Sequence, residues 1–480
     1  MNRPAQIQIG AFIFVFFPNN QDLPMLHSVP MNWRAKYASK LMSAEEAVAG
    51  VRSGQAVTVG MFDGMPPALC TALSNRAPEL EDVAVFHFVS AFPWFSFDAA
   101  RAADRPPAFR QMSPFVTNVD RGAAREGTVE YLPFALWRAG RLPYGVGPFD
   151  YHLCVVSPPD GEGWCSFGGS VWMNPTFADT SRTIVAEVDE RAIRTGGANR
   201  IHIDRIDRLV DPDPTVQQRV RRAMARAQDR KEDEIAIAEV ICTLVGMELV
   251  RDGDTVQIGT GAVSAALAPY LTDRRDLGIH TELLPGGVTG LVEAGVATGR
   301  RKSTHPGKVV ATGLAVLPDE ELAYIDGNPT FELYDFTYTD DITLLVREER
   351  LVAVNNAMEV DLTGQVNGEA TGPWPYTGPG GQTAFALAAA HAPEGRSVIV
   401  LPSSYERDGQ RHSRIVAALT EGAPVTVPRT AVDYVVTEWG VATLRGKTVR
   451  QRIGEMITIA HPDCQAHLKQ EAKRLYGWSV

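Results

Sequence analysis

The chain has 480 residues, of which 45% are hydrophobic and 21% charged; this balance is typical of a globular protein and excludes a disordered or fibrous one. Its formal net charge is −11, so there is no overall basic field to attract nucleic acid or an anionic membrane surface. The five cysteines form no CxxC pair, which favours buried thiols in a reducing compartment over a disulfide framework or a structural zinc site.

The chain begins with a segment unlike the rest. Residues 7–17 form a largely apolar run that is too short to span a bilayer. A signal peptide would have a stronger cationic start and a small-residue cleavage site, and Pro18-Asn19-Asn20 supplies neither. Residues 1–30 are therefore predicted to be an extension outside the fold, and the protein is predicted to be cytoplasmic.

A weak internal repeat follows. Residues 53–60 resemble residues 252–259, and in both places a turn leads into a short β-branched strand that ends in glycine. The matching pieces after each strand are a helical stretch (66–80 and 264–271), a second apolar strand (82–87 and 276–281) and, further on, an Asp-to-Gly turn (160–163 and 361–364). Strands that alternate with helices predict largely parallel sheets covered on both faces. We therefore expect an α/β protein with two tandem open α/β domains related by duplication.

The boundary between the two copies is predicted near residue 230. Asp211-Pro212-Asp213-Pro214 and Arg- and Ala-rich helical sequence over 215–230 separate the copies. A second helix is predicted over 233–244, with four side chains at core-facing spacing: Ile237, Val240, Ile241 and Leu244. The predicted domains are residues 31–230 and 231–480.

The two copies differ at one position that matters for chemistry. Glu282 stands just after the second strand of the later copy, where the earlier copy has Phe88. The carboxyl ends of strands in open α/β sheets face the crevice that binds ligands. Chemistry is therefore predicted in the second half, with the first half closing over it.

A glycine-rich turn lies between strand and helix at Gly259-Thr260-Gly261-Ala262-Val263. Such a turn can bind phosphates or an oxyanion through its backbone amides. A dinucleotide-binding site is an alternative, because Glu282 lies near the distance at which such a fold carries an acidic residue, although Ser264 replaces the third glycine. The second glycine turn, Gly286-Gly287, favours a glutamate at a reacting centre over one that binds only a ribose.

Further candidates lie downstream. Arg300-Arg301-Lys302 and His305 to Lys308 provide positive charge that could neutralise a phosphate or form a solvated face. Asn355-Asn356 ends a strand, and Gly378-Pro379-Gly380-Gly381-Gln382 offers backbone amides for an oxyanion. Phe92, Trp94, Phe95 and Phe97 could line a substrate pocket or belong to the core. No GxSxG, Walker A or HExxH sequence is present, which argues against a serine hydrolase, a P-loop NTPase and a zinc enzyme.

Several motifs together resemble the acetyl-CoA hydrolase/transferase family, the class I coenzyme A transferases that include 4-hydroxybutyrate and acetate or butyrate CoA-transferases. The resemblance rests on residues 157–168, 276–282, 287–296, 304–308, 359–366, 380–382, 432–440 and 459–463. It covers the chain from about Trp33 to the C-terminus. The chain departs from the family pattern at Ala384, where the family usually has aspartate, and at Gly286-Gly287, where it often has Asp-Gly.

The resemblance implies two tandem α/β domains and assigns site residues. Glu282 matches the catalytic glutamate, and the amides of Thr260 and Gly380 are the expected oxyanion donors. The residues expected to bind CoA are Gly259, Thr260, Gly261, Ala262, Val263, Lys308, Asn355, Gly378, Gly380 and Gly381. A carboxylate with an ordinary pKa of about 4.3 would be ionised at neutral pH and could attack a thioester without a base.

The expected function is transfer of coenzyme A between a short-chain acyl-CoA (acetyl-, butyryl- or 4-hydroxybutyryl-CoA-like) and a free carboxylate through a glutamyl-CoA thioester. A hydrolase of the same family is the nearest alternative, and an NAD-dependent oxidoreductase or a non-catalytic CoA sensor are distant ones. No metal and no permanently bound cofactor are expected, and neither nucleic acid nor membrane is an expected partner. A homodimer or higher homo-oligomer is expected.

Overall fold

The computed structural model describes residues 32–92, 108–141, 148–213, 215 and 232–479. The predicted extension at 1–30, the helical stretch predicted after Thr215, the boundary near residue 230 and the aromatic residues Trp94, Phe95 and Phe97 lie outside the described residues. In the described part, no helix combines the length and the hydropathy that crossing a bilayer requires.

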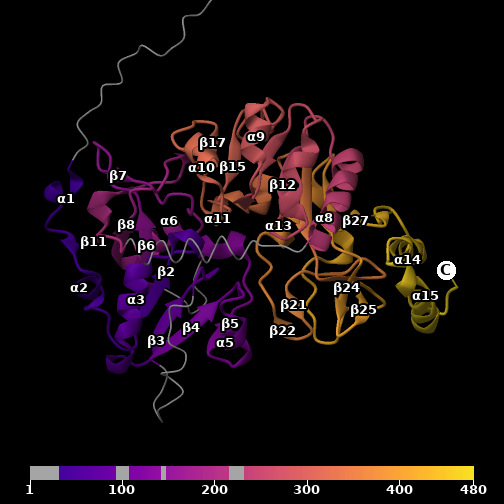
Figure 1. Cartoon of the computed structure of the whole chain (residues 1–480), viewed down its shortest axis with the longest axis horizontal. Coiled ribbons are helices and arrows are strands. Elements are labelled where there is room, and N and C mark those ends of the chain that lie inside the picture. The colour runs from indigo at the N-terminus through magenta and orange to yellow at the C-terminus, as the bar shows by residue number, and fades with distance from the viewer. Residues whose placement is uncertain (1–31, 93–107, 142–147, 214, 216–231, 480) are drawn as a thin grey trace, which may run out of the picture.

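Two large sheets organise the molecule, one in each half of the chain (Figure 1). Eight strands form the first sheet, in the order β1 (Leu41–Met42), β11 (Arg208–Val210), β8 (Ser181–Val188), β6 (Phe149–Val156), β2 (Ala56–Val59), β3 (Val83–Phe86), β4 (Phe109–Ser113) and β5 (Val129–Tyr131). Nine strands form the second, in the order β28 (Gly440–Thr443), β27 (Tyr434–Thr437), β23 (Arg396–Val400), β18 (Leu351–Asn356), β12 (Thr255–Ile258), β13 (Gly278–His280), β15 (Val309–Ala311), β17 (Phe331–Leu333) and β9 (Gly196–Gly197). All neighbouring strands in these sheets are parallel except β27 and β28.

The strand orders confirm the internal duplication. The order β11-β8-β6-β2-β3-β4-β5 in the first sheet corresponds position by position to β27-β23-β18-β12-β13-β15-β17 in the second. The central strand of each copy, β2 and β12, is the one that the repeat identified, and β12 is buried along its whole length. Burial on both faces is characteristic of parallel sheets covered by helices.

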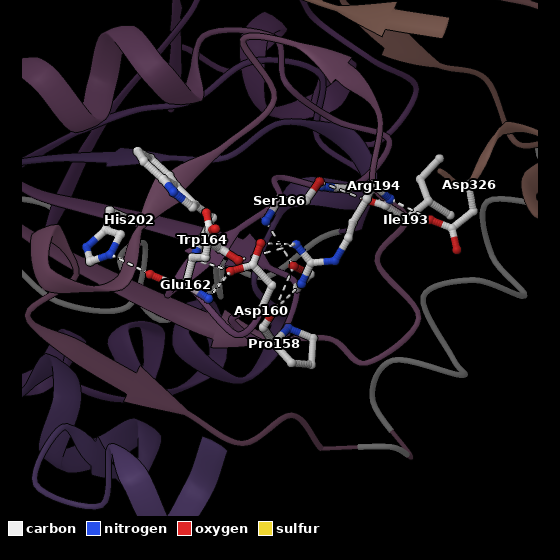
Figure 2. Close-up of polar contacts among 11 residues, drawn as sticks. Pro158, Asp160, Glu162, Trp164, Ser166, Ile193, Arg194, His202 and Asp326 are labelled. Atoms are coloured by element: carbon white, nitrogen blue, oxygen red, sulfur yellow. Dashed lines mark hydrogen bonds and ion pairs between the residues drawn. The ribbon is translucent and has the colours of Figure 1, made fainter. Parts of the chain in front are cut away.

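The Asp-to-Gly turns also have the same structure in both copies. The carboxylate of Asp160 accepts hydrogen bonds from the backbone amides of Glu162 (3.0 Å) and Trp164 (2.9 Å), as Figure 2 shows. In the second copy, Asp361 accepts the equivalent bonds from Thr363 (2.8 Å) and Gln365 (3.0 Å). Each turn closes with a glycine at positive φ, which residues with a side chain rarely adopt.

Helices cover both sheets. In the first half they are α1 (Trp33–Lys36), α2 (Ala44–Val48), α3 (Pro67–Asn75), α5 (Arg121–Arg125) and α6 (Asn174–Thr180). In the second half they are α8 (Glu232–Leu244), α9 (Val288–Glu293), α10 (Asp319–Ile325), α11 (Phe336–Thr339), α12 (Ile342–Leu345), α13 (Gln382–His391), α14 (Val449–Thr458) and α15 (Pro462–Tyr476). The remaining strands form small sheets: β7 (Trp164–Cys165) with β10 (Ile201–His202), β14 (Leu283–Leu284) with β16 (Gly313–Leu314), β19 (Glu359–Asp361) with β20 (Val366–Asn367) and β26 (Ile415–Val416), β21 (Ala370–Thr371) with β22 (Trp374–Pro375), and β24 (Ser404–Arg407) with β25 (Gln410–Ser413).

Two helix predictions need correction. In α8 the side chain of Val240 is 46% exposed, so it does not face the core as predicted. The other three predicted positions face the core, since Ile241 is buried and Ile237 and Leu244 are partly buried and pack against it. Ala238 and Cys242 of α8 are also buried. The stretch over 264–271 forms two 3₁₀ turns instead of one helix, and Pro269, which has no amide hydrogen, lies in the second of them.

One strand crosses between the two halves. β9 comes from the first half of the chain but pairs with β17 at the edge of the second sheet. The neighbouring Arg194 strengthens this connection, because its backbone amide donates to the Asp326 carboxylate (2.7 Å) and its carbonyl accepts from the Gly327 amide (2.8 Å). Figure 2 shows Arg194 between Asp326 and the turn that contains Pro158 and Asp160.

An aromatic core joins the halves below the second sheet's carboxyl edge. It contains Phe86, Phe88, Phe149, Phe177 and Trp172 from the first half, and Phe336 from the second. Leu283, the residue after Glu282, packs against this core. The first half therefore supports the strand end that carries the glutamate.

Candidate active site

Glu282 lies at the centre of the second sheet's carboxyl edge. It follows β13, which pairs with β12 on one side and β15 on the other. Its carbonyl accepts hydrogen bonds from the amides of Thr312 (2.9 Å) and Gly313 (3.2 Å), which fix the backbone where the chain passes from β13 to β14. The side chain is partly exposed, although protein atoms surround it closely. It can therefore be reached by a ligand.

The glycine loop of residues 378–381 meets this carboxylate. The backbone amide of Gly381, the residue that caps the N-terminus of α13, donates a hydrogen bond to Glu282 Oε2. Gly380 has a φ of +53°, and a Cβ atom placed on it would lie 3.5 Å from each carboxylate oxygen. The N-terminus of a helix favours a negative charge, so the loop is a suitable partner for an anionic side chain.

The pKa of Glu282 is not the ordinary value expected from the sequence. Burial raises the pKa of Glu282 to about 7, and the hydrogen bond from the Gly381 amide opposes this rise. A raised pKa means that the ionised form is less favoured than in water, so the ionisation of the glutamate depends on its neighbours. Strongly shifted carboxyl groups are frequent at reacting centres.

The glycine turn after β12 lies next to the same loop. Asn356 accepts a hydrogen bond from the Val263 amide (3.2 Å) through its side chain, and its carbonyl accepts from the Gln382 side chain (2.9 Å). A Cβ atom on Gly261 would collide with the Asn356 side chain, so this position requires glycine. Thr260 and Ala262 are exposed, and Val263 is buried. Asn356 thus brings the predicted CoA turn, Gly259 to Val263, beside the loop that holds Glu282.

Asn355, the predicted ligand-binding amide, has a different place. Its side chain is buried and exchanges two hydrogen bonds with the Gln257 side chain (2.9 and 3.0 Å). Asn355 lies beside the start of the turn, since a Cβ atom on Gly259 would be 2.8 Å from its Oδ1 atom. Asn356 contacts the rest of the turn, at Gly261 and Val263.

Lys308 lies away from Glu282. It precedes β15, whereas the glutamate follows the neighbouring strand β13, so the two residues lie at opposite edges of a parallel sheet. Its amine donates to the Pro329 carbonyl (2.6 Å) and lies 3.5 Å from the Glu332 carboxylate. Lys302, from the same cationic cluster, is buried and donates to the carbonyls of Ile279 (2.9 Å) and Lys308 (3.0 Å).

Other cations line a cavity of about 830 Å³ beyond the glycine loop. Tyr376, two residues before Gly378, is part of its wall, and so are Arg407, Arg411 and Arg414. Acidic residues also reach it, since Arg411 lies 3.0 Å from Glu406 and 3.5 Å from Asp463. The sequence does not mark this region as a candidate site, because its charges are mixed and the hairpin β24–β25 carries no glycine-rich motif.

The first half of the chain closes one side of the site. A Cβ atom on Gly378 would lie 3.0 Å from the Phe115 α-carbon, and one on Gly380 would lie 3.7 Å from the Phe115 ring. Arg121 donates to the Tyr376 carbonyl (2.7 Å) and places its guanidinium 3.5 Å from the centre of the Tyr376 ring. Residues of α5 and the preceding segment thus hold the glycine loop from the N-terminal half, as the sequence predicted in general terms.

A second carboxyl group, absent from the sequence prediction, lies beside Glu282. The Asp340 side chain is fully buried at the end of α11, and its Oδ2 atom would lie 2.5 Å from a Cβ atom on Gly381. Burial, and then the charge of Glu282, raise the pKa of Asp340 well above its usual value. Among the described residues, no group of three or more His, Cys, Asp or Glu side chains is arranged to hold a metal ion.

Both halves of the chain match known protein domains. Residues 25–218 match the acetyl-CoA hydrolase/transferase N-terminal domain, and residues 319–472 match the C-terminal domain of the same name. Glu282 lies between the two matched regions.

Several full-length proteins are similar to the chain. The 4-hydroxybutyrate coenzyme A transferase of Clostridium kluyveri is 33% identical over 93% of this chain and 100% of the relative. The butyryl-CoA:acetate CoA-transferase of Anaerostipes caccae is 30% identical over 93% of this chain and 99% of the relative. The crystal structure of RipA from Yersinia pestis is 32% identical, with a TM-score of 0.81, and covers 93% of this chain and 100% of RipA.

Proposed function

Because the chain belongs to the acetyl-CoA hydrolase/transferase family, we propose that this CoA-transferase uses Glu282 as the nucleophile that carries coenzyme A between an acyl-CoA and a free carboxylate. The observation that carries the proposal is the Glu282 carboxylate itself. One of its oxygens is held by the Gly381 amide, and the side chain stands between two glycine turns at the carboxyl edge of a parallel sheet. The relatives' names support short-chain acyl groups such as acetyl, butyryl or 4-hydroxybutyryl.

The proposed reaction forms two covalent intermediates in turn on the glutamate, an anhydride and a thioester. A carboxylate oxygen of Glu282 attacks the thioester carbonyl, the C–S bond breaks, and coenzyme A leaves as a thiolate from a mixed acyl-glutamyl anhydride. The thiolate then attacks the glutamyl carbonyl, which releases the acyl group as a carboxylate and leaves a glutamyl-CoA thioester. A second carboxylate reverses both steps and departs as the new acyl-CoA.

Backbone amides are the proposed stabilisers of this chemistry. An anhydride is uphill from a thioester, so the binding of the remote nucleotide part of CoA must stabilise the transition state. The amides of Thr260 and Gly380 are the proposed oxyanion donors, and one such donor is typically worth about 3 to 4 kcal/mol. The turn Gly259–Val263 and the loop from Gly378 to Gly381 are the proposed CoA-binding elements, with Asn356 in place of Asn355.

Chemical trapping tests the glutamyl thioester and separates a transferase from a hydrolase. Incubation with acyl-CoA alone should build up the thioester, because no acceptor is present to discharge it. Borohydride should then reduce the thioester and inactivate the enzyme, with the mass change on the peptide that contains Glu282. Addition of a suitable carboxylate before borohydride should protect the enzyme.

A hydrolase would give the opposite pattern. Steady release of free CoA at the full catalytic rate in acceptor-free buffer, with no modified glutamate, would overturn the transferase proposal. The Phe115 ring near Gly380 and the aromatic core against which Leu283 packs support the transferase, because they place apolar groups next to the glutamate. These groups would keep water away from the intermediate.

We further propose that the protein is a cytoplasmic homodimer. All five cysteines are free, and four of them are buried, which suits a reducing compartment. The exposed apolar side chains of Val240 and Met247 lie on the outer side of α8 and the turn after it, where a second copy could cover them. Light scattering should give about twice the chain mass of 52.2 kDa, with or without reductant. A single species at the monomer mass would contradict the dimer.

A further inference from the structure

Asp340 is a buried acid whose side chain makes no contact in the described part of the chain that explains its burial. It follows the last residue of α11, its side chain is fully buried, and neither carboxyl oxygen makes a hydrogen bond of good geometry with the described residues. The next residue, Asp341, caps α12 through the Thr343 amide (2.8 Å), so Asp340 is not needed for that turn. A buried carboxyl group with no partner is costly to a folded protein unless it is kept neutral or has a function.

Among the described residues, those around Asp340 include acids, and none of the salt bridges pairs it with a cation. Glu282 faces it across Gly381, since a Cβ atom on this glycine would touch Oε2 of Glu282 and Oδ2 of Asp340. The charge of Asp335, at the start of α11, also raises the pKa of Asp340, and only the Thr339 hydroxyl lowers it. His280, from β13, uses its Nε2 atom for the Thr339 carbonyl (3.0 Å), and burial lowers its pKa to about 3, so it is neutral.

We propose that Asp340 is a positioning residue that holds a proton beside Glu282, so that the two carboxyl groups share one negative charge and the Glu282 carboxylate is free to attack. This inference rests on the proposed role of Glu282. The Gly381 amide donates to Oε2 of the glutamate, and a small approach of the protonated Asp340 side chain to the same oxygen would add a second donor. Oxygen Oε1 would then be left for the thioester. Two carboxyl groups a few ångströms apart cannot both ionise at low cost, so the proton stays on the more buried one.

Unfolding experiments over pH can detect this proton directly. In the unfolded chain Asp340 ionises near pH 3.9, whereas in the folded protein it stays protonated to much higher pH. The folded state then binds one more proton than the unfolded state, so stability falls as pH rises above about 4. The Asp340→Asn variant should lack the part of this loss of stability that Asp340 causes. The unfolding constant of the wild type should therefore grow relative to that of the variant by about tenfold per pH unit.

A double-mutant cycle ties the proton to Glu282. We would measure stability from pH 4 to pH 9 for the wild type, Glu282→Gln, Asp340→Asn and the double variant. In the Glu282→Gln background the neighbouring charge is gone, so Asp340 should ionise at lower pH. The stability difference caused by Asp340→Asn should then stop growing at a lower pH than in the wild-type background. An effect of Asp340→Asn that is the same in both backgrounds, or no effect on the pH slope, would overturn the proposal. Asp341→Asn, the same substitution one residue later, is the matched control for the chemical change itself.

Activity provides a readout that a purely structural role would not give. Asp340→Ala should lower the rate of glutamyl-CoA formation by about ten- to a hundredfold, the usual worth of a hydrogen bond to a charged group. Asp340→Asn can still donate a hydrogen bond and should recover most of that loss, which also covers the case in which the alanine variant does not fold. Equal rates for the wild type and both variants would contradict a positioning role. If no glutamyl-CoA forms in the wild type, the proposed function fails, whereas the stability cycle still reports on the carboxyl pair.

Discussion

Replacement of Glu282 by alanine should abolish turnover, with a loss of at least about a thousandfold, because the proposed covalent intermediate forms on its carboxylate. CoA binding should persist, since the turn over residues 259–263 is held by Asn356 and not by the glutamate. The folded state should be as stable as the wild type or more stable at pH 8, because burial raises the pKa of Glu282 and its ionised form therefore costs stability there.

The equivalent position in the first half supplies the contrast. Phe88 is 1% exposed and packs edge to face on Phe86 with ring centres 5.1 Å apart. Phe88→Ala should therefore lower stability by about 3 to 5 kcal/mol, with its main effect on folding. Steady-state rates, CoA binding by calorimetry and thermal unfolding would be measured for both variants. If the Glu282→Ala enzyme kept a tenth or more of its rate, the assigned nucleophile would be wrong.

The second large effect is expected at Gly381. Its φ of −82° is accessible to any residue, so alanine would not strain the backbone. The added methyl group would instead collide with Oε2 of Glu282 and lie 2.5 Å from Oδ2 of Asp340. The carboxylate would have to move and lose its bond from the Gly381 amide. We expect turnover to fall by about a hundred- to a thousandfold, with little change in thermal stability.

Gly290 is the matched control for this substitution. It lies in α9, and a Cβ atom placed on it meets no other atom within 4 Å. Gly290→Ala should keep the wild-type rate, because the helix gains a better helix-forming residue and no contact changes. Comparable rates for Gly381→Ala and Gly290→Ala would show that the glycine loop does not position the glutamate.

The sequence predicts the two-sheet fold of this protein because the duplication leaves similar sequence patterns in the turns and strands of both halves. The paired turns at Asp160 and Asp361 and the paired strands β2 and β12 depend on local patterns, and both copies satisfy them. The position of Glu282 at a strand end follows from the same repeat. The family resemblance adds the glycine loop, which lies about a hundred residues further along the chain.

The places of several candidate residues have physical causes that a linear pattern does not reveal. Lys308 is close to Glu282 in sequence, but it stands before its strand, while ligands gather after the strands. Asn355 and Asn356 have the same chemistry, and the pairing of β18 with β12 places Asn355 at Gly259 and Asn356 at Gly261 and Val263. Asp340 and Asp341 are neighbours of identical type, and burial alone separates a helix cap from an acid beside the reacting centre.

The strand β9 limits how far the two halves can be treated as independent modules. Gly197 has a φ of +83°, and a Cβ atom on it would collide with the Leu333 carbonyl, so this edge of the second sheet is completed by a close backbone contact from the other half. A gene split near residue 230 would leave β17 as an open edge, which tends to pair with other chains. Recombination between relatives would face the same constraint. Chimeras that join halves from two relatives should therefore match the residues of the β9–β17 contact, because β9 belongs in sequence to the first half and completes the second sheet.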